Sequence, residues 1–598
     1  MGGAAMADEG RAPPRGRGGR GLRGAGGPGR GRAPPGPRPR ARGGRRRAGG
    51  GAAGAAGAGG AGAPGAPGWV ERAVAGSGAW RAGLEPAAER ARARVPPPAV
   101  GAAPPGLAGR CLWNGPGRVR VGEVKHGHWF DGDGMVHALD LGSPGGSAAE
   151  GGVRYSARFV RTDRFKRQEA AGEAGGMASK GAWTRAGGGT SFLGRARERL
   201  PDLGLPGNPS NTSVLNWGGR LLALCEGGPA LELDPVTLET LSSEAEGGYD
   251  FGGQVRGMFS AHGKVCPRTG ELFNFGLGQF TPGRQGLQVW RLPPPEGDPS
   301  GSSPESPAST FLPFKNPGCV SFVHDFALST GHLVFVIPPW VCPDWKATAS
   351  IAGLAPPFGH CFEWREELGT RLVVLDRASL KVVADLQVPR TFSTYHFANA
   401  FEHDGRLTVL VNSLNGCREG LERQFSDMYA ASFGHDTTNT LTRLVLDLGT
   451  GELLEHAPAV QPGVAGSEFP VIHPDFVGRQ NRFVYTSAVG PGSTSLNAVQ
   501  KIDLETGEAQ QRNFEGQTIG ESVFIPKARG GGGGAEEGKE DAGYLLVTAF
   551  GHATRTTDLV LLDAEDVTGE PVCIWRLPWH IPYTFHGHWE DNSGGWRV

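Results

Sequence analysis

A short turn motif recurs through this 598-residue chain and limits the folds that are open to it. An apolar run ends at an aspartate, Thr or Ser (often with Gly) follows a few residues later, and a second run begins. The aspartates of these units are Asp234, Asp376, Asp447, Asp503 and Asp563. Aspartate can cap its own loop and glycine accepts a positive φ, so each unit is a tight hairpin turn. The last four are 71, 56 and 60 residues apart, a spacing that favours an all-β propeller with long inter-strand insertions.

Four histidines, His262, His324, His396 and His586, stand in aromatic, strand-like surroundings in separate parts of the chain. The stretch from Gly318 to Thr330, with His324 in its middle, is expected to be a buried strand. A single such histidine is more often a hydrogen-bonded core residue than a ligand. Blades of a propeller meet at a central axis, however, where distant strands can each offer one side chain. The set therefore predicts one axial metal, and four imidazoles suit iron, copper or zinc rather than calcium or magnesium.

Three glutamates, Glu226, Glu468 and Glu521, also lie in apolar, strand-like segments, where an unpaired carboxylate would be costly to bury. Metal-bound histidines usually donate their second N–H to a carboxylate or a carbonyl. We therefore expect these glutamates to orient the histidines and to offset the charge of the metal.

The charge of the chain is divided unevenly, although it sums to zero. Residues 1–50 carry 13 arginines against Asp8 and Glu9, a net charge of +11, so the chain from Trp69 onward carries −11. The folded body therefore gives no reason to expect nucleic-acid binding. Residues 1–68, rich in Gly, Ala, Arg and Pro, cannot bury a core and are expected to be a disordered basic tail.

Three interpretations of that tail remain open: an organelle transit peptide, an RNA-contacting Arg-Gly segment and a plain solvated tail. The first predicts a plastid location, and otherwise we expect the cytoplasm. Residues 69–105 are expected to be a linker with a short helix between Trp69 and Arg94. The propeller should then occupy residues 106–598, with a glycine-rich loop insertion at 528–542.

Several other classes of protein are excluded or disfavoured. The eight cysteines form no Cys-x-x-Cys pair, which argues against a thiolate zinc site and suits a reducing compartment. No apolar run is long enough to span a membrane, and no secretory signal is recognisable. The chain contains neither Gly-x-Ser-x-Gly nor a Walker A sequence, so a hydrolase and a P-loop NTPase are disfavoured. The apolar segment 336–359, with Trp340 and Trp345, packs under its own domain or forms an exposed patch that enters a membrane surface.

Ten stretches, in order, resemble the carotenoid cleavage oxygenase family. They are Trp129–His137, Arg158–Arg161, Asn211–Ser213, Leu221–Gly228, Phe259–His262, Phe322–Ala327, His396–Glu402, Glu468–Pro470, Glu521–Pro526 and Phe585–Gly587. The resemblance implies a seven-bladed propeller with non-haem Fe(II), one per chain, held by His262, His324, His396 and His586. It also implies Glu226, Glu468 and Glu521 as partners of the last three histidines. Thr212 matches a threonine that lies near an open iron position.

The activity implied by this resemblance is cleavage of one double bond of a carotenoid or apocarotenoid by O2, which gives two carbonyl products. A stilbene-cleaving oxygenase or a polyene isomerase would keep the same ligands. A non-enzymatic propeller scaffold with an RNA-binding tail is the alternative from another class. We further expect a peripheral membrane surface as a partner, because such substrates reside in lipid. The sequence does not specify the bond cleaved, the substrate length or ring type, or the oligomeric state.

Overall fold

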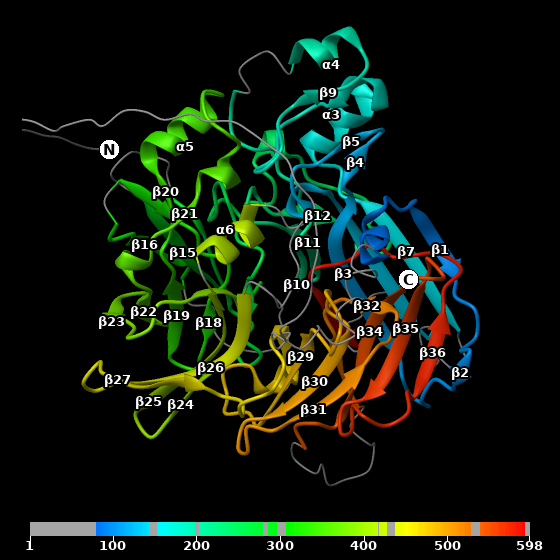
Figure 1. Cartoon of the computed structure of the whole chain (residues 1–598). Coiled ribbons are helices and arrows are strands. Elements are labelled where there is room, and N and C mark those ends of the chain that lie inside the picture. Colours follow the sequence, from blue (N-terminus) through cyan, green and yellow to red (C-terminus); the bar gives the residue numbers. More distant parts are fainter. Residues whose placement is uncertain are drawn as a thin grey trace, which may run out of the picture. The chain divides into compact units, whose positions relative to one another are not determined.

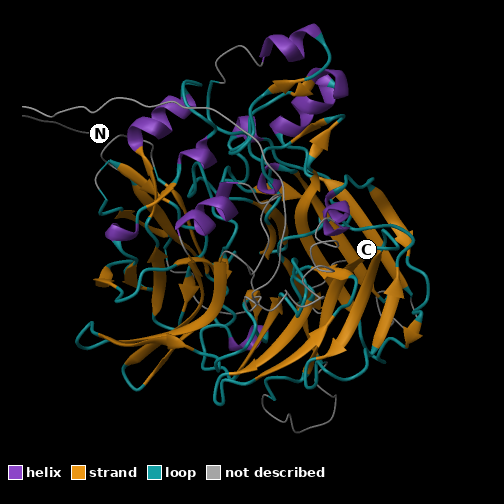
Figure 2. Cartoon of the chain, in the orientation of Figure 1, coloured by secondary structure: helices purple, strands orange, loops and turns teal. Residues whose placement is uncertain are grey.

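The computed structural model describes residues 79–591 except 143–151, 198–202, 279–284, 296–305, 317, 417, 427–436 and 528–538. The predicted leader 1–68 and most of the predicted loop 528–542 lie outside the described residues. Strands account for most of the regular structure, as Figure 2 shows. Among the described residues, no helix has the length and apolar character needed to cross a membrane.

Seven antiparallel sheets follow one another along the chain, and we number them as blades 1 to 7 (Figure 1). Blade 1 contains, in spatial order, β1 (Arg90–Arg94), β7 (Val153–Phe159), β6 (Asp133–Leu141), β3 (Gly109–Arg118) and β37 (Gly587–Asp591). Blade 2 contains β10 (Ser213–Trp217), β11 (Arg220–Leu224) and β12 (Leu231–Leu233). Blade 3 contains β13 (Lys264–Val265), β14 (Leu272–Leu277), β15 (Gly286–Leu292) and β16 (Ala308–Pro313). Blade 4 contains β18 (Ala327–Leu328), β19 (His332–Ile337), β22 (Arg371–Asp376) and β23 (Val382–Gln387).

The remaining blades repeat this plan with longer strands. Blade 5 contains β24 (Ser393–His403), β25 (Arg406–Gly416), β26 (Thr437–Asp447) and β27 (Leu453–Pro458). Blade 6 contains β28 (Ser467–Val471), β29 (Phe483–Ala488), β30 (Ala498–Asp503) and β31 (Ala509–Asn513). Blade 7 contains β32 (Gln517–Ile519) and β33 (Val523–Pro526), both paired with β34 (Gly543–Gly551), then β35 (Thr557–Asp563), β36 (Cys573–Arg576) and β2 (Val100–Gly101).

Apolar side chains fill the space between each blade and the next. Successive residues of a strand point to opposite faces of its sheet, so one strand serves two interfaces. Leu333 of β19 packs with blade 3, for example, whereas its neighbour Val334 packs with blade 5. Equivalent buried clusters join blades 1 and 2, 2 and 3, 5 and 6, and 6 and 7. A further cluster, which includes Trp113 and Trp575, joins blade 7 back to blade 1, so the described blades form a closed seven-bladed propeller.

Both ends of the folded chain take part in this closure. The early strand β2 pairs with β36 of blade 7, and the late strand β37 pairs with β3 of blade 1. The blue and red strands accordingly lie together in Figure 1. This arrangement corrects the expectation for residues 69–105. Where they are described, η1 (Ala79–Leu84) is a short helix within the predicted range, but β1 and β2 belong to blades 1 and 7 and not to a linker, because their backbone completes sheets made by distant residues.

The predicted aspartate turns are confirmed. Asp447 Oδ1 accepts hydrogen bonds from the backbone N–H groups of Gly449 and Thr450 in the turn between β26 and β27, where Gly451 has φ +73°. Asp376, Asp503 and Asp563 accept comparable backbone bonds between the third and fourth strands of blades 4, 6 and 7. The repeating sequence unit is therefore the outer hairpin of a blade.

The α-helices are α3 (Asp163–Ala171), α4 (Phe192–Arg197), α5 (Asp344–Ile351) and α6 (Arg418–Ser426). The further 3₁₀ helices are η2 (Trp129–Asp131), η3 (Glu173–Gly175), η4 (Glu244–Glu246), η5 (Phe358–Cys361), η6 (Glu366–Leu368) and η7 (Pro474–Phe476). The small sheets are β17 (Cys319–Ser321) with β20 (Trp340–Pro343) and β21 (Glu363–Trp364), β4 (Arg120–Val121) with β5 (Val124–Lys125), and β8 (Gly176–Met177) with β9 (Gly187–Gly188). α3, α4 and α5 and the small strands β4, β5 and β9 lie at the top of Figure 1, and Figure 2 shows further helical turns lower in the molecule.

Candidate metal centre

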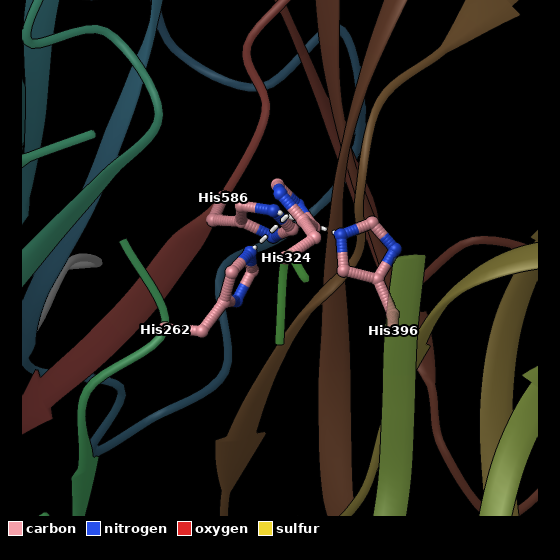
Figure 3. A group of neighbouring side chains, drawn as sticks. All are labelled: His262, His324, His396 and His586. Atoms are coloured by element: carbon pink, nitrogen blue, oxygen red, sulfur yellow. Dashed lines mark hydrogen bonds between the residues drawn. The ribbon is translucent and has the colours of Figure 1, made fainter. Parts of the chain in front are cut away.

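The structure brings His262, His324, His396 and His586 together, and one ring nitrogen of each lies within 4.8 Å of the others (Figure 3). Each lies within or shortly before the edge strand of a different blade. His262 lies just before β13, His396 lies within β24, and His586 lies just before β37. His324 lies between β17 and β18, not inside one strand as predicted, because the chain there passes from the small sheet into blade 4.

The four rings point toward a common centre (Figure 3). The Nε2 atoms of His262 and His324 are 2.9 Å apart, and those of His396 and His586 are 3.2 Å apart. Two nitrogens bound at right angles to one ion, each ~2.1 Å from it, would be ~3 Å apart. The spacing of the rings therefore suits nitrogen ligands that share a single metal ion.

Carboxylates face the opposite ring nitrogen of three of these histidines. His396 Nδ1 donates to Glu468 Oε2 at 2.7 Å, and His586 Nδ1 donates to Glu521 Oε1 at 3.0 Å. His324 Nδ1 lies 2.9 Å from Glu226 Oε1. These are the pairings expected from the sequence. With the proton held on Nδ1, each Nε2 presents a lone pair to the centre, as a metal requires.

Glu468 and Glu521 each accept further hydrogen bonds that hold the carboxylate in place. Glu468 lies in β28 and also accepts from the backbone N–H of Phe469 at 2.9 Å and from Asn439 Nδ2 at 3.2 Å. Glu521 lies between β32 and β33 and accepts from the backbone N–H of Gly587 at 2.8 Å. Glu226 lies two residues after the end of β11. No sequence pattern points to Asn439, because β26 brings it to Glu468 only through the fold.

His262 has no comparable carboxylate partner among the described residues. Its Nδ1 is 3.9 Å from Asp325 Oδ1, and that carboxylate is occupied by Lys264 Nζ at 2.9 Å and by two backbone N–H groups. Burial and the neighbouring imidazoles hold the pKa of His262 well below its ordinary value. His262 therefore favours the neutral form that a metal ligand requires, and its orientation depends on backbone and packing.

The pKa values of the other members of the cluster shift in different directions. Burial lowers the pKa of His396, although Glu468 opposes this. Burial favours the neutral form of His324 as well, but Glu226 and Asp325 outweigh it and raise the pKa of His324. Burial likewise penalises charge on Glu226 and Glu468, yet the histidines they face keep the pKa of both carboxyls below the ordinary value. The centre thus has anionic groups around it that can balance a cation.

The donor set fits a transition metal. In a water-poor interior, several lone pairs facing one another repel, and a cation at the centre removes that repulsion. Four nitrogens, with no thiolate or carboxylate directed at the centre itself, suit iron, copper or zinc. The four histidines would hold the ion, and Glu226, Glu468 and Glu521 would fix the three rings they face.

Blade 2 supplies Thr212 beside this centre. The Thr212 carbonyl accepts from the backbone N–H of His586 at 3.2 Å, and its hydroxyl donates to Asn211 Oδ1 at 3.1 Å. With Glu226 from blade 2, Glu468 from blade 6 and Glu521 from blade 7, every one of the seven described blades contributes a group to the site or its support.

A cavity of about 1020 Å³ adjoins the metal centre. Its wall includes His324, His396, His586, Glu226, Glu468 and Thr212. Aromatic side chains also line the cavity, among them Trp129, Phe130, Trp183, Phe322, Phe362 and Phe425. A largely apolar space of this size next to the four histidines can hold an elongated apolar molecule.

The two tryptophans of the predicted surface patch differ in their exposure to solvent. Trp345, at the start of α5, is 68% exposed, whereas Trp340 is 2% exposed and packs against Trp364 and Phe425. The prediction that Trp340 is a surface anchor is wrong, because β20 pairs on both edges and places it inside an aromatic cluster.

The fold and the site define a β-propeller with a tetrahistidine metal centre and an apolar cavity. The family described as retinal pigment epithelial membrane protein matches residues 84–591. The chain is 31% identical to the apocarotenoid-15,15'-oxygenase of Synechocystis sp. over 508 residues, which is 82% of this chain and 92% of the relative. It is 30% identical to a 9-cis-epoxycarotenoid dioxygenase of Oryza sativa over 82% of this chain and 73% of the relative. The chain belongs to this family of carotenoid cleavage oxygenases.

Solved structures show the same fold. A variant of the Synechocystis apocarotenoid oxygenase superposes with a TM-score of 0.72 at 28% identity, covering 86% of this chain and 98% of that one. A cobalt-substituted form of the same oxygenase superposes with a TM-score of 0.71 at 28% identity and the same coverage. The seven-bladed architecture deduced from the sheets is therefore that of the family.

We expect His324→Ala to lose most of the bound metal and all activity, because three imidazoles and a cavity in place of the fourth hold an ion poorly. Glu468→Gln should keep the metal more weakly, by about 10- to 100-fold, since it alters only the support of His396. The metal content after reconstitution with Fe(II) and desalting measures how well each of the two variants holds the metal. His403→Ala, which removes an exposed histidine outside the cluster, is the matched control. Stoichiometric metal with full activity in His324→Ala would contradict the assignment of that ligand.

Proposed function

We propose that this protein is a non-haem Fe(II) dioxygenase that cleaves one double bond of a carotenoid or apocarotenoid with O2. The observation that carries the proposal is the tetrahistidine centre in the wall of an apolar cavity of about 1020 Å³. The bound iron would supply the activation of O2. In the overall reaction the C=C bond breaks and each carbon receives one oxygen atom, so all four oxidising equivalents of O2 are used and no other reductant is needed.

The residues of the chain have separable roles in this proposal. The histidines hold the ion and the glutamates fix their orientation. The aromatic wall binds the polyene and excludes water, so that the double bond is held beside the metal. Thr212, beside His586, is our candidate for a residue near an open coordination position.

The size of the cavity favours a polyene over a smaller substrate. One relative of Aspergillus fumigatus, 27% identical over 78% of this chain, is named resveratrol cleavage oxygenase 1. A stilbene of that size would leave much of a cavity of about 1020 Å³ unfilled. A long conjugated chain can contact the aromatic wall along its length, and each buried methylene or methyl group adds to binding.

Isotope labelling tests the proposed reaction. The iron-loaded protein, incubated with a panel of carotenoids and apocarotenals under ¹⁸O2 and quenched by rapid reduction, should give two products that each carry one ¹⁸O. Mass spectrometry measures the label. A product with a changed double-bond geometry and no added oxygen would indicate an isomerase. The absence of turnover with the whole panel at full iron occupancy would favour the scaffold alternative.

We also propose that the protein collects its substrate at a lipid surface through an apolar rim formed by Leu203, Leu205, Trp345 and Leu354. Three of these side chains are 68–79% exposed, and Leu205 is also part of the cavity wall. The backbone N–H of Gly204 donates to the carbonyl of Ile351 at 2.8 Å, which fixes Leu203 and Leu205 beside the end of α5. Exposed apolar side chains next to a cavity can enter a membrane interface and supply reversible attachment.

Substitution of the rim by Trp345→Ser with Leu354→Ser should weaken partitioning onto phosphatidylcholine vesicles about 10-fold, because the lost apolar burial is worth roughly 1–3 kcal/mol. Cleavage of vesicle-borne substrate should slow, while detergent-dispersed substrate is cleaved normally. Val382→Ser with Val383→Ser, on the exposed strand β23, is the matched control and should partition like the parent protein. Equal partitioning of the two double variants onto the vesicles would contradict the proposal that this rim attaches the protein to a lipid surface.

The location of the protein in the cell is a separate proposal that rests on the leader. Residues 1–68 are basic, almost free of acidic residues and unable to form a core, so we propose that they direct the chain to a plastid. A fusion of these residues to a fluorescent reporter should enter plastids, and a reporter that stays in the cytoplasm would contradict the proposal.

A further inference from the structure

The hydroxyl of Tyr395 is a polar group in the aromatic part of the cavity that the metal centre does not use. Tyr395 precedes the ligand His396 in β24, and both side chains contribute to the cavity wall. Neighbouring residues of a regular strand would point to opposite faces. Between Thr394 and Phe397, however, the register of β24 against β25 shifts, and such a bulge re-aims side chains.

Aromatic rings surround Tyr395 on the side of the cavity near the helices. Its ring centroid lies 5.5 Å from that of His324 and 6.1 Å from that of Phe322. Phe322 in turn contacts Phe362 and Phe425. No described residue forms a hydrogen bond with the Tyr395 hydroxyl. Water can satisfy this hydroxyl while the cavity is empty of substrate, but an apolar chain that fills the cavity removes that water.

A second tyrosine in the same wall, Tyr583, has a hydrogen-bond partner for its hydroxyl within the protein. The Tyr583 hydroxyl donates to the backbone carbonyl of Trp80 at 2.7 Å, so it is satisfied whether or not a ligand is present. Leaving a phenol hydroxyl buried without a partner costs about 1–3 kcal/mol. A substrate that brings a hydrogen-bond acceptor to Tyr395 avoids this cost, and a pure hydrocarbon does not.

We propose that Tyr395 is a specificity-determining residue that donates a hydrogen bond to a carbonyl oxygen of the substrate, so that the protein selects polyene aldehydes or ketones over hydrocarbons. The inference rests on the proposed function and narrows its substrate class. A neutral phenol is a good donor and a weaker acceptor, because its oxygen lone pair is shared with the ring, and this favours a carbonyl over an alcohol.

The position of Tyr395 also bears on where the substrate is cut. Its ring lies against that of the ligand His324, so the carbonyl it binds would lie near the metal. The cleaved double bond would then be closer to the carbonyl end than to the other end of the chain. The products would be a shorter dicarbonyl fragment and a longer aldehyde, with one oxygen atom of O2 in each.

The test compares an apocarotenal with the matched hydrocarbon in which a methyl group replaces the aldehyde. Both are bound to the iron-loaded protein without O2, so that no turnover occurs, and quenching of protein fluorescence gives Kd. Tyr395→Phe keeps the ring and should raise Kd for the aldehyde about 10-fold, because the hydrogen bond is lost, while lowering Kd for the hydrocarbon, because no unpaired hydroxyl is left behind. The absorption maximum of the bound aldehyde should also move to shorter wavelength, because a hydrogen bond that polarises the carbonyl is lost.

Tyr583→Phe is the matched control, and any change it causes should be equal for the two ligands. An aldehyde preference and an absorption maximum that survive Tyr395→Phe would overturn the inference. Equal loss of affinity for both ligands would also overturn it and would mean that the ring only shapes the cavity. These outcomes differ from failure of the proposed function, in which the parent protein with full iron would cleave neither polyene in the presence of O2.

Discussion

The structure depends on bringing four imidazole lone pairs to one point in a water-poor interior. Such an arrangement is unfavourable without a cation and strongly favourable with one. Carboxylates behind His324, His396 and His586 hold those rings with the lone pair directed inward. The ligands are separated by up to 324 residues along the chain, from His262 to His586, so only a fold that returns repeatedly to one axis can assemble them. The seven-bladed ring meets that requirement because each described blade delivers one group or more to the axis.

The position of the histidines therefore depends on closure of the seven-bladed ring. The ligand His586 lies immediately before β37, which completes blade 1, while β2 from the start of the folded chain completes blade 7. Apolar clusters between every pair of neighbouring blades set the distance of each edge strand from the axis. A well-packed interface resists small displacements, so the spacing of the four nitrogens is fixed by packing far from the metal. Segments between β17 and β21, together with η1, η2 and α6, then contribute to the wall of the cavity.

Much of this could be predicted from the sequence where the signal is local. Asp447 and Gly451 specify their turn through their own side-chain and backbone chemistry, and the four histidines stand out against apolar strand patterns. The rest depends on distant partners. The run Arg90–Arg94 has no apolar pattern, so β1 forms only because blade 1 offers it an edge. From the sequence alone Trp340 resembles a surface residue, and it is buried because β20 pairs with β21. Tyr395 would point away from His396 without the bulge in β24.

The most direct test of the central claim is X-ray absorption spectroscopy at the iron edge on the purified, iron-loaded protein. The atoms bound to iron should be nitrogen and oxygen, with the outer-ring scattering of four imidazoles and with no sulfur. Iron bound to a thiolate sulfur, or to fewer than three imidazoles at full iron occupancy, would contradict that claim.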